Sequence, residues 1–201
     1  MFFGSNFTKP VNNLNFPVKL HTFTGIIEQN LEYTLNIVST LEDPAVKYKN
    51  EDSSAKLAKL ETDIKNDILN YPQEEIVKII TFTTLMESVY NSTNEIKGYI
   101  KELVKYPPLN IDLSEIAMKI SGIVKKAIDG FLSGNDIYNL ETEITETERL
   151  INAALRQLHK LNGKERQGKD RIVYYSCVIT VLKEISGKAS SLQFAHVSTS
   201  A

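Results

Sequence analysis

The stretch LETDI at residues 60–64 returns as LETEI at residues 140–144, and this pair decides which fold the chain predicts. Each copy lies in a segment of helical periodicity that is followed by a longer one. The longer segments carry LMESV at 85–89 and LKEIS at 182–186. Similar patterns at the same place in the order of elements indicate a duplicated unit. We therefore expect two sequence-related halves.

Six segments around these copies place apolar residues three and four positions apart, which is the spacing of one helix face. They predict helices over about residues 20–41, 57–68, 74–105, 113–131, 137–161 and 170–192. No segment keeps the alternation of two that a half-buried strand requires. The sequence predicts an all-α fold with three helices in each half, which close as bundles because each helix has one apolar stripe.

The break Tyr106-Pro107-Pro108 is the predicted boundary between the halves. We expect an N-terminal extended segment over residues 1–19, a first three-helix repeat over 20–106 and a second over 107–201. Asp112 and Glu115 are spaced as an N-terminal capping pair for the fourth helix.

Composition narrows the class of protein. The chain has 201 residues, 42% of them hydrophobic, and a net charge of −2, so no global field favours nucleic acid or an anionic membrane. The longest uncharged stretch near the C-terminus is too short for the ~30 Å hydrocarbon core of a bilayer. Cys177 is the only cysteine and is expected in the core. We expect a cytoplasmic protein without direct membrane insertion.

Three motifs give the chain a resemblance to a known family. MFFG at 1–4, LKEISGKA at 182–189 and the fainter LMESVYN at 85–91 are similar to segments of the PhoU family. LKEISGKA is similar to the signature Leu-Glu-Arg-Ile-Gly-Asp-His-Ala of that family's third helix. The resemblance is to the PhoU-related archaeal and bacterial branch of phosphate transport regulators. It implies a PhoU-like fold of two tandem three-helix bundles forming one elongated six-helix domain.

The resemblance also implies positions for metal clusters, held by Glu/Asp-x-x-x-Asp pairs on the second and third helices of each repeat. Positions i and i+4 share a helix face, so both carboxylates can reach one ion. Here each Glu is kept and each Asp is replaced, in the pairs Glu61/Lys65, Glu87/Asn91, Glu141/Thr145 and Glu184/Lys188. We expect no metal and no cofactor at these positions, and we expect the two Glu–Lys pairs to neutralise themselves.

Other polar residues give weaker signals. Asp63 and Asp67 could hold a hard cation, although a solvated face is favoured. The acidic cluster Glu141, Glu143, Glu146 and Glu148 is predicted to be solvated or to face a partner. The basic excess between Lys160 and Arg171 could meet an anionic partner, with ordinary solvation favoured. No histidine has di-iron or zinc spacing, and no catalytic motif is present in His21, His159 or His196.

The function implied by the resemblance is a non-enzymatic regulator or adaptor that binds a protein, either a phosphate transporter or its regulator. At a membrane it would be peripheral to that transporter, and the size of the bundle is compatible with a homodimer. Two alternatives stay open. One is a metal-binding PhoU-like protein or an enzyme that uses the carboxylates of Glu61, Glu87, Glu141 and Glu184. The other is a helical structural protein unrelated to phosphate.

Overall fold

The computed structural model describes residues 16–42, 53–133, 140–162 and 169–197. Over these ranges the chain is helical and contains no strand, as the periodicity predicts. The elements are α1 (Phe16–Thr40), α3 (Ser53–Asp67), the short 3-10 helix η1 (Ile68–Asn70), α4 (Gln73–Leu103), α5 (Ser114–Ser133), α6 (Glu141–Asn162) and α7 (Lys169–Val197). None of the described helices is both long enough and apolar enough to cross a bilayer.

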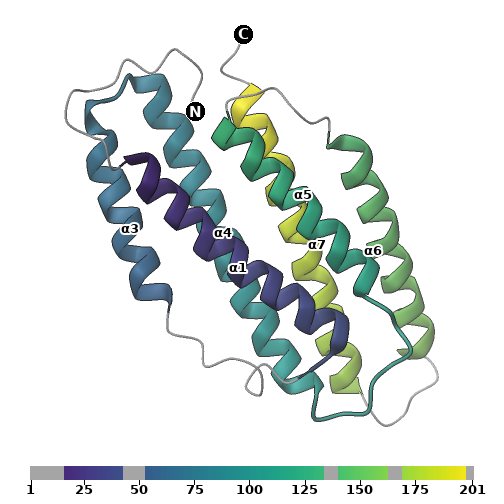
Figure 1. Cartoon of the computed structure of the whole chain (residues 1–201). Coiled ribbons are helices and arrows are strands. Elements are labelled where there is room, and N and C mark those ends of the chain that lie inside the picture. The colour runs from purple at the N-terminus through teal and green to yellow at the C-terminus, as the bar shows by residue number, and fades with distance from the viewer. Residues whose placement is uncertain (1–15, 43–52, 134–139, 163–168, 198–201) are drawn as a thin grey trace.

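The helices form two layers with one helix at each outer edge (Figure 1). α1 and α5 lie side by side in one layer and pack on α4 and α7 in the other. α3 packs on α1 at one edge, while α6 packs on α5 and α7 at the opposite edge. The most extensive contact joins α4 and α7. The buried apolar side chains of both halves therefore form one continuous core.

The rings of Phe82 and Phe131 lie at the centre of this core. They stack with centroids 3.8 Å apart and planes 7° from parallel, which joins α4 to α5. The apolar spacing of the third helix predicts a buried stripe that includes Ile80 and omits Phe82. That part of the prediction is wrong, because Ile80 is 41% exposed whereas Phe82 and Ile79 are buried. α4 contacts both α1 and α7, so it buries a wider face than one stripe.

The start of the chain differs from the expected extended segment over residues 1–19. α1 begins at Phe16, because Pro17 lies in its first turn, where a missing N–H leaves no helical bond unmade. Phe16 is buried, and its ring packs on the ring of Tyr71 with the two centroids 5.2 Å apart. Residues 1–15 lie outside the described residues. So do Asp43-Pro44, which from the sequence should end the first helix, and Asn135-Asp136, which should cap the fifth.

The connection between α4 and α5 contains the predicted break at Tyr106-Pro107-Pro108. Three side chains from α6 and α7 bind its backbone. The Tyr175 hydroxyl accepts from the Leu109 amide at 3.2 Å, Arg171 donates to the Pro107 carbonyl at 2.7 Å, and Gln157 donates to the Asn110 carbonyl at 2.7 Å. This connection is therefore fixed to the second half of the chain.

Two smaller predictions are corrected. The Asp112 carboxylate accepts from the Ser114 amide at 2.8 Å and from its hydroxyl at 2.6 Å, rather than pairing with Glu115. The carboxylate thus lies just outside the first turn of α5 and satisfies one of its free N–H groups. Cys177 is only partly buried and lies near Tyr99 of α4.

Phe82→Ala should lower the free energy of unfolding by about 3–5 kcal/mol, because a buried ring is replaced by a cavity. Urea denaturation followed by circular dichroism measures the change. The matched control is Val77→Ala on the same helix, where the side chain is 56% exposed and the change should stay within about 0.5 kcal/mol. Equal effects in the two variants would contradict the central place of the Phe82–Phe131 stack.

Candidate functional site

The family-implied positions of the first half lie on α3 and α4, and three of them interact through their charges. The Lys65 ammonium donates to the Glu61 carboxylate, which confirms the predicted pair. This hydrogen bond raises the pKa of Lys65 above its ordinary value, and the charges of Glu61 and Glu87 raise it further. Glu87 of α4 therefore lies near the same ammonium. Lys65 is thus paired with Glu61 and also influenced by the charge of Glu87, while Asn91 is exposed.

The corresponding positions of the second half do not come together in the same way. Glu141 and Thr145 on α6 and Glu184 on α7 are exposed. The predicted Glu184–Lys188 pair is wrong. Lys188 is partly buried and donates to the Ser92 hydroxyl at 2.6 Å and the Ser88 carbonyl at 3.3 Å. Because α7 packs on α4, its inward-facing lysine binds across the interface rather than along its own helix.

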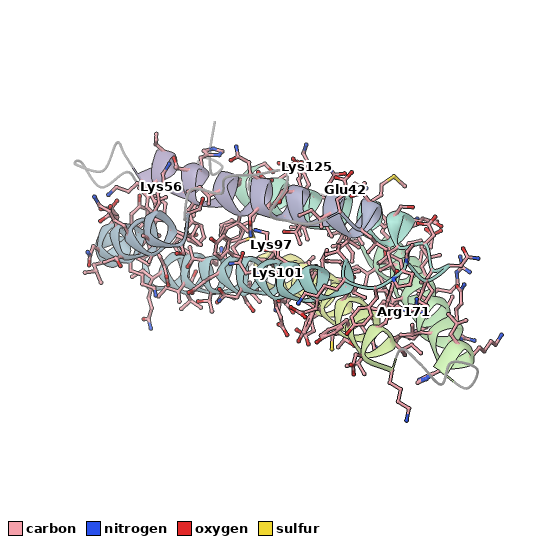
Figure 2. All side chains as sticks on the ribbon, turned by 90° about the horizontal axis from the view of Figure 1, so that it is seen from below. Glu42, Lys56, Lys97, Lys101, Lys125 and Arg171 are labelled. Carbon is pink, nitrogen blue, oxygen red and sulfur yellow. The ribbon has the colours of Figure 1, made fainter. Side chains whose placement is uncertain are left out.

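A second lysine lies between α1 and α4, where the sequence gave no signal for it. The Lys97 ammonium donates to the Asn30 side-chain carbonyl, and the Asn30 amide donates to the Thr93 hydroxyl. The ammonium also lies 5.3 Å from the centroid of the Tyr33 ring. Figure 2 shows Lys97 directed into the space between the two helices. Burial lowers the pKa of Lys97 to about 8.

The remaining predicted carboxylates are mostly engaged in ion pairs. Asp67 pairs with Lys19 of α1 at 2.6 Å, so it holds α3 to α1 rather than lying on a solvated face. In the acidic cluster, Glu143 pairs with Lys126 of α5 and Glu146 pairs with Lys119 at 2.9 Å. Glu148 is exposed, as that prediction allowed.

The histidines do not gather into a site within the part of the chain that the structure describes. His21 on α1 and His159 on α6 are both exposed, and the side chain of His196 lies outside the described residues. Among the described residues, no group of three His, Cys, Asp or Glu side chains could hold a metal ion.

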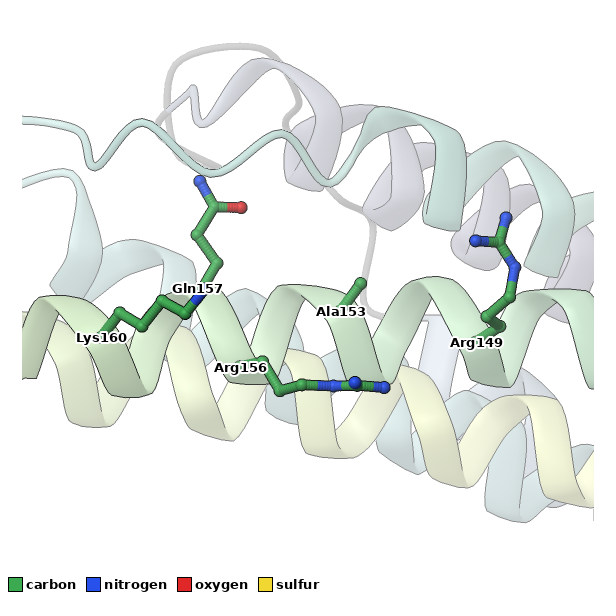
Figure 3. Close-up of a pocket in the computed structure, with 5 residues that line it drawn as sticks. All are labelled: Arg149, Ala153, Arg156, Gln157 and Lys160. Carbon is green, nitrogen blue, oxygen red and sulfur yellow. The ribbon is translucent and has the colours of Figure 1, made fainter.

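A shallow hollow of about 480 Å³ lies on the outer face of α6. Figure 3 shows its five lining residues, with Arg149 and Lys160 towards its two ends. They are Arg149, Ala153, Arg156, Gln157 and Lys160. The predicted basic excess began at Lys160 and missed the two arginines. Their spacing along the sequence was the available signal, since Arg149, Arg156 and Lys160 fall on one helix face.

No family model, no curated protein and no solved structure matches the chain. Its function therefore has to be inferred from the helix arrangement and from these polar contacts. Three features are available for that inference. They are the Glu61–Lys65 pair, the two lysines bound to neutral oxygens on α1 and α4, and the basic hollow on α6.

Lys65→Asp should create divalent-cation binding, because it places a carboxylate one turn from Glu61 and near Glu87. Isothermal titration with Mn²⁺ should detect an equimolar site in this variant that is absent from the unmodified protein. Lys56→Asp on the same helix is the control. It makes the same change of charge at an exposed position that is more than one helical turn from Glu61. Identical titrations for Lys65→Asp and Lys56→Asp would rule out the expected ligand set.

The free energy of unfolding should rise with pH from about 8 to about 10.5. Lys97 in the folded chain releases its proton near the lower value, while its ordinary pKa is 10.5. In this interval the unfolded state binds more protons, so raising the pH favours folding. Below pH 8 both states are protonated and the contribution is constant.

Urea denaturation of the unmodified protein and of Lys97→Met across this pH range isolates the lysine from other titrating groups. The difference in unfolding free energy between the two proteins should change with pH. Parallel profiles would show that Lys97 keeps its ordinary pKa.

Proposed function

We propose that this protein is a PhoU-like regulator or adaptor of phosphate transport that acts by binding another protein. One observation supports this beyond the resemblance of the motifs. The repeated pentapeptides lie on α3 and at the start of α6, the two helices at opposite outer edges (Figure 1). Each is followed in the chain by one of the two long helices, α4 and α7, that contact each other.

In this proposal α1, α3 and α4 form one three-helix bundle, and α5, α6 and α7 form a second in tandem with it. The two bundles make one elongated domain because α4 packs on α7 and α1 packs on α5. A duplicated unit related in this way presents long helical faces to solvent. Such faces bind partners through a few apolar or charged anchors rather than through a deep pocket.

The mechanism proposed is binding rather than catalysis. At the first family position an ammonium lies where a cation would be, and Lys65 repels a second positive charge. At the corresponding positions of the second half, Glu141 and Glu184 are exposed, and Lys188 binds Ser92 of α4. We propose a cytoplasmic protein that reaches the membrane through a phosphate transporter or its regulator. Exposed apolar side chains on three helices, Val77, Met118 and Val173, offer contact area for such a partner or for a second copy.

The affinity-tagged protein should retain a phosphate transporter subunit or a regulator of that transporter from cell extracts, under phosphate starvation, phosphate excess or both. Mass spectrometry of the retained proteins gives the identity of the partner. Untagged extract and an unrelated helical protein with the same tag control for nonspecific capture. Recovery of neither class of partner in either condition would refute the phosphate connection.

Metal analysis of the same purified protein tests the alternative of a metal-binding protein. We expect iron, zinc and manganese well below one equivalent per chain. A full equivalent that is lost on replacing Glu61 and Glu87 by Gln would instead favour the metal-binding alternative.

A further inference from the structure

The outer face of α6 differs from the other charged surfaces of the described chain in the balance of its charges. Some lysines elsewhere are paired with carboxylates, as in Lys19–Asp67, Lys105–Glu102 and Lys119–Glu146, whereas others are exposed without an ion pair among the described residues. The α6 face is distinguished by three cations that gather around one hollow. Over the described residues, Arg149, Arg156 and Lys160 form no ion pair, and no carboxylate lines their hollow. Glu146, the nearest acid that Arg149 influences, is bound first by Lys119. Three cations on one face are thus left for an external anion.

The geometry of this face favours an extended occupant over a single small ion. Arg149 and Lys160 are separated by three helical turns, which is about 16 Å along the axis. The small side chain of Ala153 lies between them and leaves the floor of the hollow open. One side is bounded by the α4–α5 connection, where Gln157 binds the Asn110 carbonyl. A phosphate ion could reach only one end, whereas about five extended residues span the whole face.

The face is also rigid, which favours binding. Ile151, Ala154 and Leu158 on the opposite side of α6 are buried against α5 and α7. The three cations are therefore held on a fixed helix, and only their own side chains need to be ordered on binding. The exposed acid Glu148, at the N-terminal side of the hollow, repels an acidic chain and limits it to the part of α6 from Arg149 onward.

We propose that the basic face of α6, formed by Arg149, Arg156 and Lys160, docks an acidic segment of a partner protein. This inference rests on the proposed function, since it assigns the surface by which the adaptor holds its partner. The segment carries Asp or Glu side chains spaced over the length of the hollow. Its carboxylates pair with these guanidinium and ammonium groups, which form no ion pair within the described chain; the Arg156 Nε donates only to the Asn152 carbonyl of its own helix, at 3.3 Å.

The test uses the full chain and a fluorescein-labelled oligoglutamate of about ten residues, long enough to cover the face. Fluorescence anisotropy compares the unmodified protein with the triple variant R149Q/R156Q/K160Q. The matched control is K56Q/K59Q/K101Q, which removes three exposed lysines from α3 and α4 and changes the net charge equally; Figure 2 labels Lys56 and Lys101. Circular dichroism confirms that each variant is helical.

The α6 variant should bind the probe about tenfold more weakly than the unmodified protein, since three solvent-exposed pairs are lost. The control variant should stay within about twofold. Binding should also weaken as salt is raised, and backbone amide shifts in NMR spectra should map to residues 149–160. Equal loss in both variants, or shifts that map elsewhere, would overturn the proposal. So would displacement of the probe by inorganic phosphate at the same concentration of negative charge.

The cell-extract experiment, repeated with R149Q/R156Q/K160Q, separates this inference from the proposed function. Loss of the partner from this variant, with retention by the control variant, supports docking on α6. Equal retention by all three proteins would leave the adaptor function standing and refute the α6 surface. Absence of a transporter or regulator from all three would refute the proposed function itself.

Discussion

The packing of α4 against α7 is the contact on which the rest of this structure depends. These two long helices come one from each half of the chain. α7 also packs on α5 and α6, and α4 also packs on α1, which in turn carries α3. A single helix of this kind buries too little apolar surface to be stable alone, so its stability comes from its neighbours. With α4 and α7 joined, α1 and α5 can cover them from one side, and α3 and α6 can close the two edges (Figure 1).

Polar groups placed inside this packing constrain it further. Lys188 binds Ser88 and Ser92 across the α4–α7 contact, and Lys97 binds Asn30 across the α1–α4 contact. A partly buried ammonium with neutral acceptors gains less than one paired with a carboxylate, because its desolvation is only partly offset. Its acceptors are nevertheless fixed in position. A shift of one helix along its neighbour would separate each ammonium from its oxygens, so these bonds favour one register over others.

Local spacing was sufficient to predict the features that depend on a single helix. The helical class and the Glu61–Lys65 pair follow from positions three and four apart. The same rule places Arg149, Arg156 and Lys160 on one face, although the predicted basic excess began at Lys160 and missed both arginines. The partners of Lys188 and Lys97 lie far away in the sequence, and no local pattern marks them. The prediction placed Ile80 on the buried face, whereas the structure buries Ile79 and exposes Ile80, for a similar reason. A helix that packs on two neighbours has no single buried stripe. Which of two adjacent isoleucines is buried then depends on how the helices pack against each other.

The fixed connection between α4 and α5 has a consequence for motion. Tyr175, Arg171 and Gln157 bind its backbone from Pro107 to Asn110, so this segment belongs mechanically to α6 and α7. The chain between the end of α4 at Leu103 and Pro107 has no comparable fastening from the second half among the bonds described here. Were the halves to pivot when a partner docks, the hinge would fall in those few residues. The basic face of α6 and the connection from Pro107 to Asn110 would then move together as one rigid unit, and the shape of the face would not change.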